Sequence, residues 1–175
     1  MRTACFIAIL ICLSCCKHSH MEMQNGKDFD TKLEELILFE KKINQEYYLK
    51  VDVPKEVLEY RLTYMGSVEN NEKEKLNFIY FTKYSGLYED SKRANSVIVI
   101  YKNQKRLGHY YVGGGFNKTP IISRNEMIVG YDEDNCNQFT RICFRDSIPQ
   151  EIFICCRIDK GKQFGDVYHF EKSIK

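Results

Sequence analysis

Alternation with a period of two, sustained over most of the chain, constrains the fold of this sequence more than any other feature. It is clearest over residues 58–64, where leucine and tyrosine alternate with charged and polar side chains in the run LEYRLTY. Successive side chains of a β-strand point to opposite faces of a sheet, so this run indicates a strand with one buried face. We therefore expect a domain built mainly from β-strands.

The same pattern predicts a series of strands separated by short connections. They cover residues 49–53, 58–64, 76–84, 97–101, 107–112, 120–123, 126–131, 139–145, 152–158 and 167–170. The segment 97–101 is apolar throughout and is predicted as a central strand, whereas 65–73, which contains Gly66, is predicted as a turn. Strands without helices between them favour antiparallel pairing. The expected fold is mainly β, an antiparallel meander that forms a sandwich or a barrel.

A single helix is expected before the strands. Thr31 and Glu34 have the spacing of a capping box, in which a hydroxyl and a carboxylate each bond a free backbone amide. Apolar side chains then recur at helical spacing at Leu33, Leu36, Ile37, Ile43 and Tyr47. The pattern predicts a helix that starts at Thr31 and ends between residues 44 and 48.

One hairpin is also predicted near the C-terminus. If Arg145 faces Glu151, opposite charges pair, and Phe144 then lies opposite Ile152. The loop of this hairpin covers residues 146–150.

The first residues have the composition of an export signal. Arg2 supplies a positive charge, an apolar run covers residues 4–13, and small side chains and cysteines follow. This order is typical of a secretory signal. A membrane-spanning helix needs about 20 apolar residues, and this run is much shorter.

The end of the apolar run, Leu13-Ser14-Cys15-Cys16, resembles the lipobox of bacterial lipoproteins, in particular those of Bacteroidetes. The resemblance implies that one cysteine receives a diacylglycerol, that the signal is cut before it, and that a fatty acid such as palmitate acylates the new N-terminus. Cys15, directly after Ser14, is the preferred acceptor. Cys16, with Leu13 well placed before it, is the alternative.

This resemblance also predicts the domain organisation and the location. Residues 1–14 are the signal peptide, residues 15–28 are the lipidated cysteine and a flexible tether, and residues 29–175 are a single β-rich domain. The protein is then anchored to a membrane of the bacterial cell envelope, at the outer membrane or the periplasmic face. Several acyl chains hold a protein almost permanently, whereas one does so only marginally. An ordinary cleaved signal with incidental cysteines is the alternative.

Four cysteines remain in the predicted domain: Cys136, Cys143, Cys155 and Cys156. An exported protein can form disulfides, and four cysteines allow three pairings that the sequence does not distinguish. Buried free thiols are the preferred interpretation, because a small cysteine packs well in a core. The spacings do not match a structural zinc site.

Three further motifs are candidate sites. The acidic cluster 132–135 lacks the glycine and glutamate positions of a calcium loop, so no metal site is predicted. The glycines 113–115 are not followed by a predicted helix, which favours a turn over a phosphate cradle. Asp146-Ser147-Ile148 resembles the acceptor for O-glycosylation of exported Bacteroidetes proteins, which implies a sugar on Ser147. An ordinary turn also explains these three residues.

Charge and chemistry limit the functions that the sequence allows. The formal net charge of +2 does not predict nucleic-acid binding. His109 and His169 fall within predicted strands, and no nucleophile motif accompanies them, so no catalytic residue and no cofactor are predicted. We expect a non-catalytic module that binds an envelope protein or a small ligand. A hydrolase acting on envelope polymers or polysaccharides, and an immunity or inhibitor lipoprotein, are the alternatives.

Overall fold

The computed structural model describes residues 26–54, 56–116, 118–130 and 138–173. The chain divides at Asp30, and the compact unit Thr31–Lys175 holds the described strands and the greater part of helix α2. The mainly β fold and the N-terminal helix predicted from the sequence are confirmed. The elements are α2 (Gly26–Glu40), β1 (Glu46–Val53), β2 (Glu56–Glu69), β3 (Lys75–Gly86), the 3-10 turn η1 (Glu89–Ser91), β4 (Arg93–Lys102), β5 (Lys105–Tyr111), β6 (Ile121–Ser123), β7 (Glu126–Gly130), β8 (Phe139–Cys143), β9 (Glu151–Asp159) and β10 (Lys162–Lys172).

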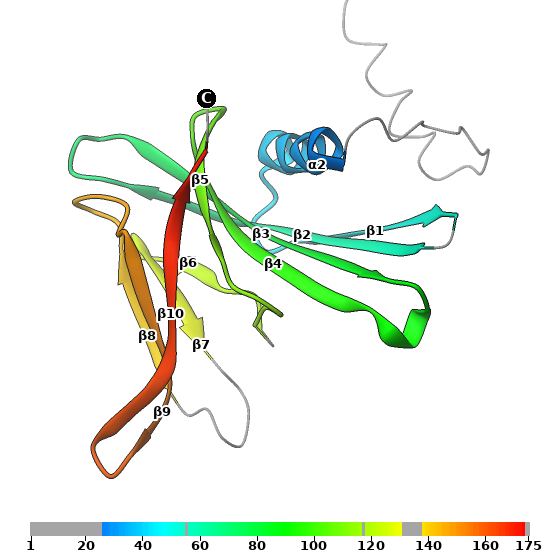
Figure 1. Ribbon diagram of the computed structural model, residues 1–175. Helices are drawn as coiled ribbons and strands as arrows, with labels where there is room; N and C mark the ends of the chain where they lie inside the picture. Colours follow the sequence, from blue (N-terminus) through cyan, green and yellow to red (C-terminus); the bar gives the residue numbers. More distant parts are fainter. Residues whose placement is uncertain (1–25, 55, 117, 131–137, 174–175) are drawn as a thin grey trace, which may run out of the picture. The chain divides into compact units, whose positions relative to one another are not determined.

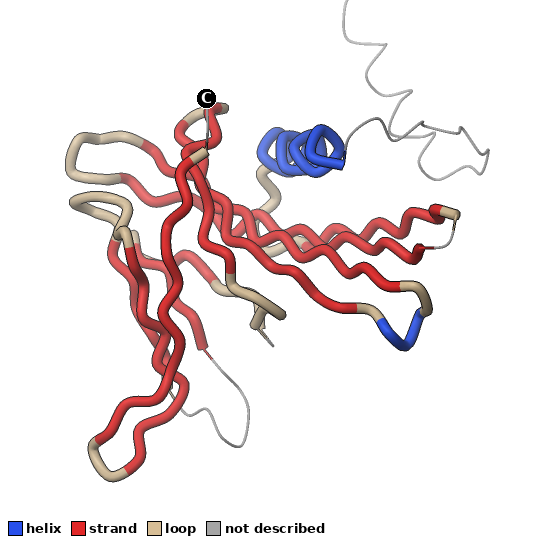
Figure 2. Tube along the Cα trace, in the orientation of Figure 1, coloured by secondary structure: helices blue, strands red, loops and turns tan. Residues whose placement is uncertain are grey.

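Within these described ranges the strands form two antiparallel sheets. The larger has seven strands in the order β1-β2-β3-β4-β5-β10-β9, and the smaller has three in the order β6-β7-β8. The chain makes a meander from β1 to β5, leaves to build the small sheet, and returns so that β10 pairs with β5 (Figures 1 and 2). The large sheet keeps β1 and β9 as edges, so the alternative of a closed barrel is wrong.

Both faces of the large sheet are buried in its central strands. Ile98 and Ile100 of β4 join Met127 of β7 in the main core cluster, while Val99 between them points to the other face and is equally buried. Figure 1 shows α2 on one face of the large sheet and the small sheet on the other. A strand covered on both faces is expected to be apolar throughout. Because β4 lies in the middle of the seven-stranded sheet, the prediction of a central strand at 97–101 is confirmed.

A β-bulge at Gly66 extends β2 through the first part of the segment predicted as a turn, residues 65–69, while residues 70–73 do form the turn between β2 and β3. The register with β3 shifts between Tyr64 and Gly66, and β2 continues to Glu69. Before the bulge the even-numbered side chains, such as Leu62, belong to the α2 face. After the bulge Val68 belongs to the core shared with the small sheet. Gly66 has φ +126°, a conformation that favours glycine, and a Cβ atom there would lie 3.3 Å from the Cβ of Ile122 in β6.

Helix α2 differs from its prediction at both ends. It begins at Gly26, so Thr31 lies inside the helix and is not its cap, and it ends at Glu40, so Tyr47 belongs to β1. Glu34 does not cap the helix either. Its carboxylate is buried and accepts hydrogen bonds from the hydroxyl of Tyr101 at 2.7 Å and from Nε of Arg106 at 2.9 Å. The spacing of a capping box thus reflects a contact between the helix and the sheet.

The predicted hairpin between residues 139–145 and 152–158 is wrong. Among the described strands β8 pairs with β7, and β9 pairs with β10. A two-residue turn at Lys160 and Gly161, with φ angles of 47° and 77°, joins β9 to β10 and fixes that pairing. Phe144 and Ile152 nevertheless share the main core cluster, because the apolar pattern decides which face is buried and leaves the neighbouring strand undetermined.

Cys143 is a free thiol, as preferred from the sequence, and Cys155 forms no disulfide with it. The prediction that they are buried is wrong for Cys143, which is exposed, and Cys155 is half-buried. Cys136 and the side chain of Cys156 lie outside the described residues.

Candidate functional site

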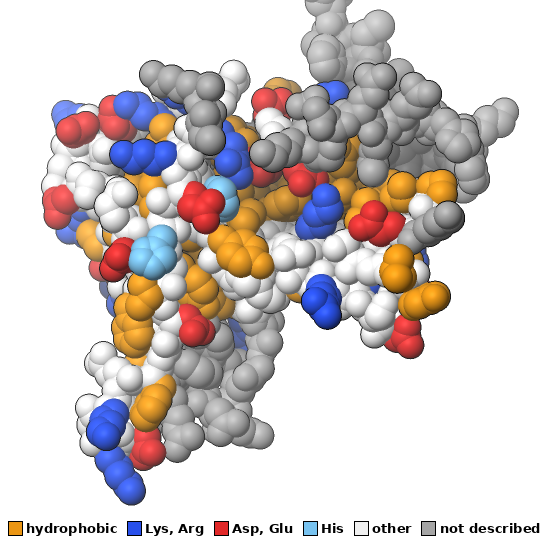
Figure 3. Space-filling model, viewed as in Figure 1, with side chains coloured by type: hydrophobic (Ala, Val, Ile, Leu, Met, Phe, Trp, Pro, Cys, Tyr) orange, Lys and Arg blue, Asp and Glu red, His pale blue; other side chains and the backbone are white. Residues whose placement is uncertain are grey.

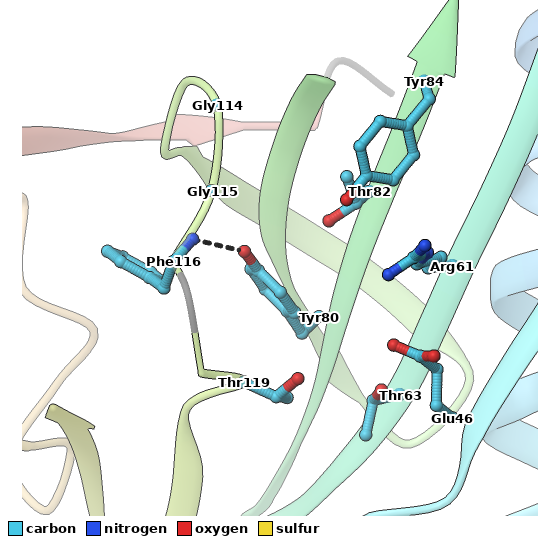
Figure 4. A pocket seen from close by; sticks show the side chains of 10 residues that line it. All are labelled: Glu46, Arg61, Thr63, Tyr80, Thr82, Tyr84, Gly114, Gly115, Phe116 and Thr119. Carbon is cyan, nitrogen blue, oxygen red and sulfur yellow. Dashed lines mark hydrogen bonds between the residues drawn. The ribbon is translucent and has the colours of Figure 1, made fainter. Parts of the chain in front are cut away.

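A polar pocket of about 290 Å³ lies on the face of the large sheet opposite α2. Its floor is formed by β1, β2 and β3, and its wall is the segment that follows β5 (Figure 4). We call it the Arg61 pocket, and it is lined by Glu46, Arg61, Thr63, Tyr80, Thr82, Tyr84, Gly114, Gly115, Phe116 and Thr119.

Strand register places the polar side chains of the floor side by side. Arg61 of β2 pairs with Tyr48 of β1 and with Thr82 of β3. Thr63 of β2 pairs with Tyr80 of β3. Directly paired residues in antiparallel strands project from the same face, with Cβ atoms about 5 Å apart. The alternation that buries Leu62 on the α2 face therefore turns the intervening polar residues toward this pocket.

Arg61 is the unpaired cation of the pocket. Its guanidinium carbon lies 5.2 Å from the ring centre of Tyr84 and 5.9 Å from that of Tyr48. Among the described residues it makes no ion pair or hydrogen bond. A guanidinium offers parallel N–H donors that match a carboxylate or phosphate, and the two rings hold its side chain in place.

The lysines nearest to this end of the sheet are already neutralised. Lys92 bonds Glu59 at 2.6 Å and Glu89 at 2.7 Å, and Glu89 also pairs with Lys50. Hydrogen bonds from Lys50 and Lys92 lower the pKa of Glu89 to about 2, and Lys92 lowers the pKa of Glu59. An anion that enters the pocket therefore meets Arg61 as the available positive charge.

Hydroxyl groups line the rest of the floor. The oxygen of Tyr80 accepts a hydrogen bond of 2.8 Å from the backbone N–H of Phe116, as the dashed line in Figure 4 shows, which leaves its own proton to donate. Thr82 shares a buried hydrogen bond of 2.9 Å with Ser96. Thr63 lies between Glu46 of β1 and Tyr80 of β3 in the register and makes no hydrogen bond through its side chain in the described structure. These groups suit a ligand with several polar atoms.

Two of the glycines 113–115, Gly114 and Gly115, belong to the wall of the pocket. Gly115 has φ +91°, and a Cβ atom there would lie 2.5 Å from the hydroxyl oxygens of both Ser96 and Tyr80. Only glycine lets the chain approach the floor so closely. The prediction of a turn at these residues is correct, but its place beside a pocket was missed, because the sequence does not show which strand lies beneath a loop.

A second pocket, of about 400 Å³, lies near the predicted glycosylation site. Leu76, Leu107 and Phe170 contribute apolar surface, and Ser147, in the loop between β8 and β9, is also among the lining residues. Ser147 is exposed, and the neighbouring Asp146 accepts a hydrogen bond of 2.6 Å from Asn71. The modification of Ser147 stays a prediction.

The two histidines of the domain lie away from the Arg61 pocket. His109 on β5 is half-buried, with Nε2 3.6 Å from Glu171, and burial lowers its pKa, as does the nearby Arg106. His169 is exposed and lies 3.2 Å from Glu151. Within the described ranges histidine, cysteine, aspartate and glutamate do not gather in the groups of three that would hold a metal ion.

Several sequence predictions fall outside the described residues. They are the lipidation sites Cys15 and Cys16, the signal peptide, and the acidic cluster 132–135. Over the part of the chain that the structure does describe, no helix has both the length and the apolar character needed to cross a membrane. Figure 3 shows positive and negative side chains interspersed on the visible face, in keeping with the small net charge.

No protein-family model, curated protein or solved structure matches this chain. The case for a function therefore depends on the geometry of the Arg61 pocket.

Proposed function

We propose that this chain is an exported, lipid-anchored, non-catalytic binding module of the bacterial cell envelope, and that it binds a small anionic ligand in the Arg61 pocket. The observation that carries the proposal is the guanidinium of Arg61. It lies between the rings of Tyr48 and Tyr84 in a polar pocket and has no carboxylate partner among the described residues.

The energetics favour a carboxylate or phosphate at this position. Hydrogen bonds to charged groups contribute about 1.5–3 kcal/mol each, and a bidentate pair with arginine adds geometric selectivity. Tyr48 and Tyr84 restrict the side chain before the ligand arrives, so binding costs less conformational entropy. The volume of about 290 Å³ lies at the lower end of ligand pockets, which run from about 300 to 1,000 Å³, and favours a small ligand.

The same residues support binding over hydrolysis. A glycosidase of the common type uses two carboxyl groups that flank the scissile bond, and Glu46 is the carboxylate among the residues that line this pocket. A histidine base must lie within hydrogen-bond reach of its nucleophile, and neither His109 nor His169 lines the pocket. We therefore assign the described side chains to holding a ligand.

The ligand is tested by calorimetry on the full chain, with butyrate, inorganic phosphate and the neutral butanamide as probes. We expect the anions to bind and butanamide not to bind. Arg61→Gln should weaken anion binding about tenfold or more, which is about 1.4 kcal/mol. Arg93→Gln is the matched control, because Arg93 is exposed on β4 and does not line the pocket. Equal affinities of these two variants would overturn the proposal.

The anchor is tested separately in bacterial cells by labelling with a radioactive fatty acid. We expect the label on the unmodified chain, and its loss in either Cys15→Ala or Cys16→Ala identifies the acceptor. If both single variants and the double variant keep the label, or if the unmodified chain is never labelled, the proposed anchor is wrong.

A further inference from the structure

The Arg61 pocket contains a negative group as well as a positive one. Glu46, the first residue of β1, also lines it, and Figure 4 shows its carboxylate on the same side as the guanidinium of Arg61. Glu46 pairs with Thr63 in the sheet, two residues beyond Arg61 on β2. The two charged residues are therefore diagonal neighbours on one face, a placement that puts Cβ atoms about 7 Å apart.

This carboxylate and this guanidinium do not neutralise each other. Among the described residues no ion pair or hydrogen bond joins Glu46 to Arg61, and Glu46 makes no other ion pair or hydrogen bond. The side chain of Arg61 is instead held between Tyr48 and Tyr84. The carboxylate of Glu46 can therefore still accept hydrogen bonds, and the guanidinium of Arg61 can still donate them.

A ligand that carries both charges fits this arrangement better than a simple anion. An anion bound at Arg61 alone is repelled by the carboxylate of Glu46, because like charges so close disfavour each other. A ligand with an ammonium group a few bonds from its carboxylate replaces that repulsion by an attraction. The hydroxyls of Tyr80 and Thr63 then remain for further polar atoms of the ligand.

We propose that the ligand of the Arg61 pocket is a small zwitterion of the α-amino acid type, an inference that rests on the proposed function. Its carboxylate lies at the guanidinium of Arg61 and its ammonium group at the carboxylate of Glu46. Because both charged residues are exposed to water, either contact alone is weak, and selectivity arises from making the two together.

The test uses calorimetry on the full chain with three probes that differ in the charged groups they carry. They are 2-aminobutyrate in both enantiomers, butyrate, which lacks the ammonium group, and propylamine, which lacks the carboxylate. We expect one enantiomer of 2-aminobutyrate to bind about tenfold or more tightly than butyrate, and propylamine to bind more weakly than both.

Two substitutions separate the contributions of the two charges. Glu46→Gln should reduce the preference for 2-aminobutyrate over butyrate to about one, and Arg61→Gln should weaken the binding of both probes about tenfold or more. Glu35→Gln is the control, because Glu35 is exposed on α2 and does not line the pocket. Circular dichroism confirms that each variant is folded.

The outcomes distinguish this inference from the proposed function. If butyrate binds as tightly as 2-aminobutyrate, or if Glu46→Gln leaves the preference unchanged, the zwitterion inference is overturned while anion binding at Arg61 stands. If Arg61→Gln leaves the binding of both probes unchanged, the inference and the proposed function are overturned together.

Discussion

Replacing Glu34 by glutamine probes the contact that fixes α2 to the large sheet. The side chain of Glu34 is 4% exposed and that of Arg106 is 28% exposed. The carboxylate accepts from Tyr101 at 2.7 Å and from Arg106 at 2.9 and 3.4 Å. Glutamine keeps the size and one acceptor oxygen but loses the charge.

The expected loss of stability follows from these exposures. Removing one partner of a buried ion pair costs about 3–5 kcal/mol. Arg106 is partly hydrated, which reduces its share, while Tyr101 is 1% exposed and has no access to water. We therefore expect Glu34→Gln to lower the free energy of unfolding by about 2 kcal/mol. Combined with Tyr101→Phe, the double variant should show a coupling of about 1 kcal/mol.

Urea denaturation followed by circular dichroism measures this effect. With a slope of about 2 kcal/mol per molar urea, the midpoint should fall by about 1 M. Glu35→Gln, an exposed neighbour on the same helix, should stay within about 0.5 kcal/mol of the unmodified protein. If the two variants unfold at the same urea concentration, the carboxylate of Glu34 does not hold the helix as described.

Three further predictions concern the pocket wall, the core and the response to pH. Gly115→Ala should lower the free energy of unfolding by about 1–3 kcal/mol in urea titrations and weaken ligand binding, because φ is +91° and the new Cβ displaces the hydroxyl of Tyr80; unchanged stability and binding would contradict this geometry. Phe144→Ala should cost about 3–5 kcal/mol, because Phe144 is fully buried, and a loss below 1 kcal/mol would contradict its place in the core. Burial and Arg106 lower the pKa of His109 below 6.5, so the unfolded chain binds the proton more tightly, and stability should fall as the pH drops below 6.5. His109→Gln should reduce that slope in urea midpoints measured from pH 5 to pH 8, and an unchanged slope would refute the assignment.

The alternating and apolar runs were sufficient to predict where the described strands lie, but the strands extend beyond those runs, as β4 and β10 do. The sequence was insufficient where a local turn or cap motif competed with a tertiary contact from another strand. Gly66 is typical of a turn, yet it lies close to Ile122 and β2 stays extended through a bulge, so the turn begins only at Asn70. Thr31 and Glu34 have the spacing of a cap, yet Tyr101 and Arg106 engage the carboxylate from the sheet.

Strand pairing was the least predictable part of the fold. The charge pair Arg145–Glu151 favoured one hairpin, but the turn at Lys160 and Gly161 is shorter and pairs β9 with β10 instead. The sequence signal for that turn is Gly161, which lies between the charged residues Asp159 and Lys162 at the ends of the two strands. The candidate site was harder to foresee, because Glu46, Arg61 and Gly115 come from separate segments that only the tertiary register brings together.

The binding of an anion by Arg61 is tested most directly by NMR of the arginine side chains. The ¹⁵N-labelled full chain is titrated with butyrate, and the Nε–H signals of its arginines are followed, with Arg61→Gln and Arg93→Gln identifying two of them. The account predicts that the signal of Arg61 shifts with saturation while that of Arg93 stays in place. A saturating shift at another arginine, with the Arg61 signal unmoved, would contradict it.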